Sequence, residues 1–192
     1  MSNKALLILD VINELIHEKG SVGKDGYFEQ AQKKSLLKNL KEIISLAREK
    51  ETLIIYVIFG FDKNFTEWSE KTKLFQKVKE NNQAILGEWS TKIHSDVSPQ
   101  DKDYVIVKHR VDPFFGTNLE QVLRSNNIDE LFLTGVSSEF VVLASVISGH
   151  DRDYTINVIE ECVSSSDKYS HDCAIHIMSK LSNVVSINDI KF

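Results

Sequence analysis

The chain has 192 residues, 42% hydrophobic and 27% charged, a composition typical of one globular domain over residues 1-192 with a substantial core. The formal net charge is -5, and its 28 acidic and 23 basic residues are spread along the chain, so neither nucleic acid nor a membrane surface is an expected partner. The sequence offers no apolar run suited to a signal peptide or a membrane span and only two cysteines, so we expect a cytoplasmic protein with reduced thiols.

The first half of the chain combines apolar runs with one amphipathic stretch. The run 6–9 is continuously apolar, which is typical of a parallel strand covered on both faces. Between about 28 and 50, apolar residues recur at helical intervals and predict one amphipathic helix. A second strand is expected at 53–59. The long connection over 60–102 is predicted to contain a helix near 66–81 and to contribute to ligand specificity.

The second half alternates strands and helices. Its predicted strands are 104–108, 130–135, 154–160 and 183–187, and its predicted helices lie near 118–126, 139–151 and 168–181. This alternation predicts an α/β fold, a three-layer α/β/α sandwich around a parallel six-stranded sheet with right-handed crossovers.

Polar groups follow three of the apolar runs. Asp10 follows ALLIL, Lys108 ends YVIVK, and the turn from Gly135 to Glu139 follows LFLT. Because the carboxyl ends of parallel strands meet at one edge of a sheet, we expect these groups to converge where α/β proteins bind small molecules. An Asp in this position is also a common turn or capping residue, and a lysine at a strand end is commonly solvated. Both alternatives remain open at this point.

Several segments along nearly the whole chain carry a family resemblance. They read KALLILDVINEL, GEWSTKIHSDV, VIVKHRVDPFFGTNLEQVLR, LFLTGVSSEFVVLASVISGHDRDY and VIEECVSSSDKYSH. In this order and spacing they resemble the isochorismatase-like hydrolase superfamily, which includes nicotinamidases, carbamoylsarcosine amidase, related cysteine hydrolases and isochorismatase. The resemblance implies a Rossmann-like fold with sheet order 3-2-1-4-5-6 and, as in many members, a homodimer or larger homo-oligomer.

The cysteine hydrolases of this superfamily use an Asp, a Lys and a Cys in their reaction centre. Asp10 and Lys108 match the first two, whereas Val141 stands at the position of the Cys. A valine has no nucleophilic atom, so attack by a thiolate is not expected. Isochorismatase also lacks the thiol and cleaves a vinyl ether by protonation and addition of water. The resemblance therefore implies a hydrolase that acts on a small organic molecule through acid/base chemistry of Asp10 and Lys108.

Two further hypotheses stay open. A scaffold that has lost turnover would bind a metabolite or a protein partner, and a cavity filled by Phe140 and Val141 would favour this alternative. Ser137 or Ser138 would replace the thiol as nucleophile only with a nearby base, and the sequence identifies none. The resemblance also implies a cis peptide bond between Val136 and Ser137, at the turn that forms the oxyanion hole of the family.

Neither a metal nor another cofactor is expected. Nicotinamidases carry metal-binding histidines beside the second strand, where this chain reads FGFDKNF. His94 and His171 lie in segments that match family patterns, and a structural hydrogen-bonding role is expected for both. Aromatic side chains are candidates for lining a pocket, although such residues also build cores and interfaces. These candidates are Phe61, Trp89, Phe114, Phe115 and Phe140.

Overall fold

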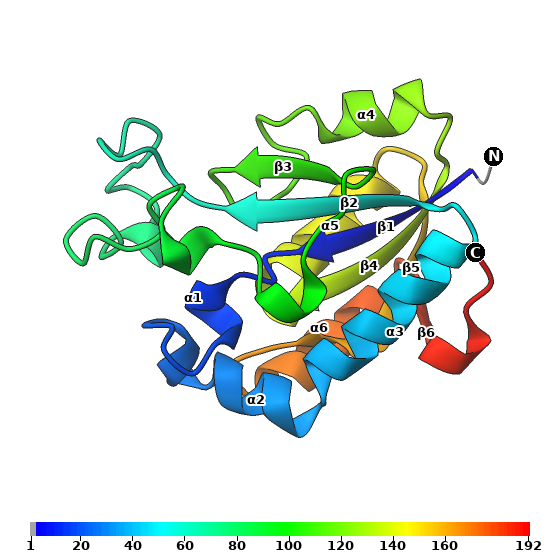
Figure 1. The fold of residues 1–192 in the computed structure, drawn as a ribbon, viewed down its shortest axis with the longest axis horizontal. Helices are drawn as coiled ribbons and strands as arrows, with labels where there is room; N and C mark the ends of the chain where they lie inside the picture. Colours follow the sequence, from blue (N-terminus) through cyan, green and yellow to red (C-terminus); the bar gives the residue numbers. More distant parts are fainter. Residues whose placement is uncertain (1–2) are drawn as a thin grey trace.

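A parallel sheet forms the centre of the computed structural model, which describes residues 3–192 (Figure 1). Its strands are β1 (Lys4–Leu9), β2 (Leu53–Phe59), β3 (Tyr104–Lys108), β4 (Glu130–Val136), β5 (Thr155–Ser164) and β6 (Asn183–Val185). Within the described residues it is a 6-stranded sheet with the order β3-β2-β1-β4-β5-β6. The predicted fold class and strand order are confirmed.

β1 lies in the middle of the sheet because both of its faces are apolar. Leu6 and Ile8 contribute to one hydrophobic cluster and Leu7 and Leu9 to another, and all four are at most 1% exposed. β1 pairs with β2 on one side and with β4 on the other. Asp10, the next residue, is therefore placed at the centre of the carboxyl edge of the sheet.

Helices cover both faces of this sheet. They are α1 (Asn13–Ile16), α2 (Tyr27–Lys33), α3 (Leu36–Glu49), α4 (Leu119–Ser125), α5 (Leu143–His150) and α6 (Lys168–Met178). Apolar residues of α2 and α3 join the cluster of Leu6 and Ile8, while residues of α4, α5 and α6 join the cluster of Leu7 and Leu9. Among residues 3–192, no helix has the length and apolar character needed to cross a membrane.

The predicted helix over 28–50 is two helices. Ser35 has a left-handed backbone (φ 53°) and separates α2 from α3. Apolar residues keep a helical period around this break, so the pattern that predicted one helix does not detect it. The Asn39 side chain donates hydrogen bonds to the carbonyl oxygens of Lys34 and Glu161, which ties the break to β5.

The predicted helix near 66–81 is wrong. The segment consists mainly of turns, with a 3-10 turn at Lys73–Phe75. Its apolar residues pack into a small separate cluster, in which Phe61 and Phe75 are buried and the rings of Phe59 and Phe75 stack at 4.7 Å. Ring packing therefore holds this segment beside the end of β2, where a helix was expected.

The other predicted elements are confirmed with shifts at their ends. β5 continues to Ser164, and β6 ends at Val185. The segment predicted as a helix over 139–151 begins with a π-helical turn, Ser138–Val142, and continues as α5. This turn follows directly on β4 and forms one wall of the candidate site.

Candidate active site

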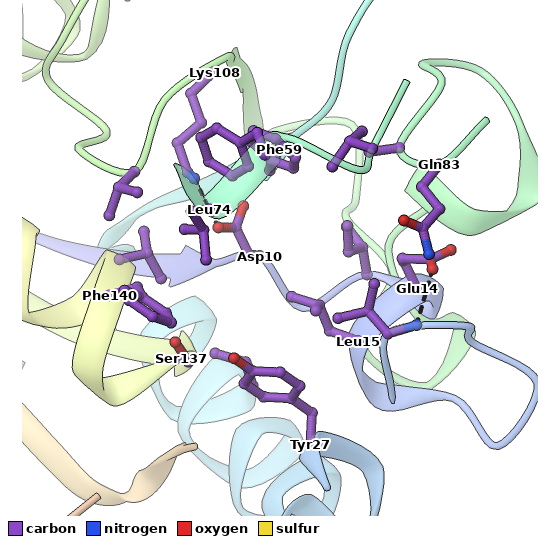
Figure 2. Close-up of a pocket in the computed structure, with 18 residues that line it drawn as sticks. Asp10, Glu14, Leu15, Tyr27, Phe59, Leu74, Gln83, Lys108, Ser137 and Phe140 are labelled. Carbon is purple, nitrogen blue, oxygen red and sulfur yellow. Dashed lines mark hydrogen bonds and ion pairs between the residues drawn. The ribbon is translucent and has the colours of Figure 1, made fainter. Parts of the chain in front are cut away.

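Three strand ends meet at one cavity on the carboxyl edge of the sheet (Figure 2). Asp10 follows β1, Lys108 ends β3, and Val136 and Ser137 stand at the end of β4. The convergence predicted from the strand order is therefore present. The cavity has a volume of about 150 Å³. An engineered cavity of about this volume holds benzene, so the space suits a small organic molecule.

Asp10 and Lys108 form a buried ion pair in the wall of the cavity. Lys108 Nζ lies 2.8 Å from Asp10 Oδ2 and donates a second hydrogen bond of 3.0 Å to the Arg110 carbonyl oxygen. The ammonium also lies 5.1 Å from the centre of the Phe59 ring. The two residues are 5% and 2% exposed, and Asp10 Oδ1 has no hydrogen-bond partner among the described residues. One carboxylate oxygen is therefore buried without a hydrogen-bond partner in the described part of the chain.

The backbone at Asp10 turns sharply where β1 ends. Its φ is 51°, in the left-handed region, and its N–H still donates a 2.8 Å hydrogen bond to the Val57 carbonyl oxygen. Burial raises the pKa of the Asp10 carboxyl above its ordinary value, while the charge and the hydrogen bond of Lys108 oppose the rise. A carboxylate with a raised pKa is a stronger base than an exposed one.

Apolar side chains make up most of the cavity wall. They include Leu15, Leu74, Phe75, Val78, Val111 and Phe140. Four of these belong to the long connection over 60–102 or to the loop after β3, and the connection also supplies Gln83 and Ala84. The connection therefore lines the cavity, and its contribution to ligand specificity stays a prediction. It adds apolar side chains to the same cavity wall that holds Asp10.

The sequence did not predict three polar residues of the cavity wall, which are Glu14, Tyr27 and Gln83. Tyr27 begins α2 and lies near Ser137, and Glu14 of α1 lies near Gln83 on another side of the cavity (Figure 2). The Tyr27 hydroxyl lies 3.4 Å from Glu139 Oε1, and burial together with the charge of Glu139 raises the pKa of Tyr27 to about 12. The phenol therefore stays neutral. These three residues follow no strand, so the rule that found Asp10 and Lys108 does not reach them.

Four of the five aromatic candidates lie outside this cavity, and only Phe140 lines it. Phe61 is fully buried in the cluster with Phe75, and Phe114 lies in the main core with its ring 4.8 Å from the Arg152 guanidinium. Trp89 is half-exposed with its ring edge-on to His17, and Phe115 is 65% exposed. The prediction is therefore wrong for Phe61, Trp89, Phe114 and Phe115. Phe61 and Phe114 are buried in clusters, and Trp89 and Phe115 are exposed, so none of the four rings reaches the cavity.

The two serines of the turn after β4 face different surroundings. Ser137 lines the cavity, and the peptide bond between Val136 and Ser137 is cis. The Ser138 side chain is fully buried, and its Oγ lies 2.8 Å from His171 Nδ1. Sequence reasoning missed this contact because 33 residues separate the two positions.

His171 also contacts a cation. Its Nε2 lies 2.8 Å from Lys34 Nζ, and an ammonium group only donates hydrogen bonds, so Nε2 accepts and Nδ1 carries the proton. Burial and the charge of Lys34 lower the pKa of His171 to about 4, so the ring is neutral at pH 7. In this tautomer Nδ1–H donates to Ser138 Oγ and does not accept the serine proton. The cluster holds the turn in place but does not activate Ser138.

Comparison with known proteins decides the family. The model of the isochorismatase domain matches residues 4–189. The chain belongs to the isochorismatase family. The uncharacterized isochorismatase family protein YaaI of Bacillus subtilis is 26% identical over 183 residues, which cover 94% of this chain and 91% of YaaI. The ureidoacrylate amidohydrolase RutB of Agrobacterium fabrum is 28% identical over 172 residues, which cover 83% of this chain and 75% of RutB.

A solved structure of the family shows the same fold. N-carbamoylsarcosine amidase from Thermoplasma acidophilum superimposes with a TM-score of 0.77 at 22% identity, covering 98% of this chain and 99% of the amidase. The family and these homologues support a hydrolase at the level of the superfamily.

The thiols of this family member lie away from the cavity. Cys162 is buried, and burial raises its pKa to about 12, whereas Cys173 is exposed on α6. Neither residue lines the cavity, but Val141 does, with only 2% of its surface exposed. The wall beside Asp10 and Lys108 therefore presents a hydrocarbon at this position.

The residues beside β2 do not fit the metal site of nicotinamidases. Asp62 Oδ1 accepts a 2.6 Å hydrogen bond from the Thr66 N–H, and Oδ2 accepts one of 3.3 Å from Asn64. This carboxylate is thus occupied within its own loop. Across residues 3–192, no group of three or more His, Cys, Asp or Glu side chains is arranged to hold a metal ion.

Proposed function

We propose that this protein hydrolyses a small organic molecule through acid/base chemistry of Asp10 and Lys108, without a cysteine nucleophile. The observation that carries the proposal is the buried Asp10–Lys108 pair, which lines the same cavity as Val141 and leaves Asp10 Oδ1 without a hydrogen-bond partner among residues 3–192. Membership of a hydrolase family supports the reaction class. The proposal adds that a water molecule attacks the substrate, and that no side chain of the enzyme acts as the nucleophile.

In the proposed reaction, Asp10 acts as the base. Oδ1 accepts a proton from a water molecule, whose oxygen adds to the electrophilic carbon of the substrate. Asp10 then returns the proton to the leaving group, so that one water is consumed and no covalent enzyme intermediate forms. Lys108 holds Oδ2 in position and stabilises negative charge in the transition state. The turn at Val136 and Ser137 lines the same space and is assigned to bind the carbonyl oxygen of the substrate.

An inactive scaffold is the alternative, and the cavity argues against it. Phe140 and Val141 line the space but leave a volume of about 150 Å³. A buried ammonium and a carboxylate with an unpartnered oxygen cost stability in an apolar wall, and a protein that only binds an apolar molecule gains nothing from this cost.

The test begins with a screen of small neutral amides, ureides, esters and vinyl ethers for hydrolysis, read by mass spectrometry of the products. Once a substrate is found, turnover is measured before and after treatment with iodoacetamide, and the intact mass of the enzyme is recorded during turnover. We expect unchanged activity and no mass increase from bound substrate. Loss of activity on alkylation, or a covalent adduct with the substrate, contradicts the proposal.

A further inference from the structure

The charges in the cavity wall restrict what the cavity can bind. Among the described residues that line it, the acidic and basic side chains are Asp10, Glu14 and Lys108, and there is no arginine or histidine. Tyr27 stays neutral, and Glu139, whose Oε1 lies 3.4 Å from the Tyr27 hydroxyl, is not among the described residues that line the cavity. Two carboxylates therefore face a single ammonium.

The ammonium of Lys108 is already used. It is paired with Asp10 at 2.8 Å, bonded to the Arg110 carbonyl oxygen at 3.0 Å, and packed against the Phe59 ring. A substrate carboxylate or phosphate would have to compete with Asp10 for this cation in a buried site. No second cation lines the described part of the wall, so an anion entering the cavity is left without a counter-charge.

Glu14 supplies the second carboxylate and has an oxygen to spare. Its Oε1 accepts hydrogen bonds from the Ser21 hydroxyl and, at 3.1 Å, from the Val22 N–H. Glu14 is 6% exposed, and its Oε2 forms no hydrogen bond or ion pair within residues 3–192. Gln83 Nε2 donates to the same Ser21 hydroxyl at 2.6 Å, which holds the Glu14 side chain in place. Figure 2 shows Glu14 and Gln83 together on a different side of the cavity from Tyr27 and Ser137.

We infer that the cavity selects a neutral or cationic small molecule with an apolar body and an N–H group that donates to Glu14, and that it rejects carboxylates and phosphates. The apolar wall accommodates the body, Asp10 and Lys108 act at one end, and Glu14 identifies the other end. This inference deepens the proposed function and rests on it only in calling the bound molecule a substrate.

The test uses three probes with the same ring and different charges: benzylamine, benzamide and benzoate. Their affinities are measured by isothermal titration calorimetry at pH 7, without turnover. We expect benzylamine and benzamide to bind and benzoate to bind at least tenfold more weakly than benzamide. Benzoate binding as tightly as benzamide, or no binding of any probe at millimolar concentration, overturns the inference.

Two variants locate the selection at Glu14. Glu14→Gln keeps the oxygen that accepts from the Val22 N–H but removes the charge, so benzylamine affinity should fall at least tenfold while benzamide affinity changes little. Gln83→Lys keeps the Glu14 carboxylate and an N–H donor beside the Ser21 hydroxyl but adds a cation, so benzylamine affinity should fall and benzoate affinity should rise; this variant tests the selection independently of how well Glu14→Gln folds. An unchanged order of the three probes in both variants contradicts the inference.

Failure of this inference and failure of the proposed function are distinguishable. If Asp10→Asn retains full turnover while the probes follow the expected order, the acid/base mechanism is wrong and the charge selection stands. If Asp10→Asn abolishes turnover while benzoate binds well, the mechanism stands and the selection by Glu14 is wrong.

Discussion

The turn that ends β4 separates two polar clusters whose side chains differ in what they have left to bind. On one side, Asp10 and Lys108 line a cavity, and Asp10 Oδ1 has no partner. On the other side, both ring nitrogens of His171 are bonded, to Lys34 and to Ser138. Serine, histidine and lysine are the residue types of hydrolytic sites, yet here they stabilise the turn. The state of the His171 ring nitrogens, more than the residue types around them, therefore separates this cluster from the Asp10–Lys108 pair.

The largest expected effect is that of Asp10→Asn, and it tests directly whether the two polar clusters differ in function. Asp10→Asn removes the proposed base and should lower turnover of any substrate found by about 10³-fold, within the range of general base catalysis. Ser138→Ala removes a hydroxyl that His171 does not activate, so its turnover should stay within about threefold of wild type. Initial rates at saturating substrate provide the measurement, with circular dichroism to verify folding of both variants. Full turnover in Asp10→Asn, or lost turnover in Ser138→Ala, would mean that the Ser138–His171 cluster and not the Asp10–Lys108 pair carries the reaction.

The two lysines should differ in their effect on stability. Lys108→Met leaves the buried Asp10 carboxyl without its partner and should lower the free energy of unfolding by about 3 kcal/mol. Lys34 is only half-buried, and Lys34→Met should cost about 1 kcal/mol through its lost hydrogen bonds. Urea denaturation at pH 7 measures both. Equal losses would mean that the Asp10–Lys108 pair is better solvated than the structure indicates.

The fold and half of the site could be predicted because their signals are local in the sequence. The apolar run of β1 identifies a buried strand, and Asp10 and Lys108 stand directly at strand ends, where the topology of a parallel sheet brings them to one edge. The family resemblance adds the strand order. The first two inferences need only short segments and a rule about parallel sheets, whereas the resemblance draws on segments along nearly the whole chain.

The rest of the site depends on contacts that no segment contains. Glu14 and Gln83 meet through the Ser21 hydroxyl, and Ser138 meets His171 across 33 residues. The connection over 60–102 forms turns where a helix was predicted, because its phenylalanine rings pack against each other and not along a helical face. Hydrogen bonds between distant segments decide the first two, and ring packing decides the third, and periodicity carries no information about either.

Acid should destabilise the folded protein by protonating His171. The pKa of His171 is lowered to about 4 in the folded protein, whereas an unfolded chain binds this proton below about pH 6.5. The stability that the neutral ring contributes is therefore complete above pH 6.5 and is lost as the pH falls toward 4. At pH 5 the loss is about 2 kcal/mol. Urea denaturation at pH 7 and pH 5 should show a smaller loss for His171→Gln than for wild type; the same loss in both would place the titration elsewhere.

The smallest expected effect is a difference in alkylation rate between thiols introduced on the two sides of the turn. In a Cys173→Ser background, Val141→Cys places sulfur in the wall of the cavity that also holds Lys108, and a nearby cation favours the reactive thiolate. Ser138→Cys places sulfur against His171 in a fully buried position. Alkylation by iodoacetamide at pH 7, followed by mass spectrometry, should be at least tenfold faster for Val141→Cys. The remaining Cys162 is buried with a pKa raised to about 12 and should not react, so the Cys173→Ser protein alone gives the background rate. Equal rates for the two variants would show that reagents reach both positions alike, and the distinction between a cavity wall at Val141 and a fully buried position at Ser138 would fail.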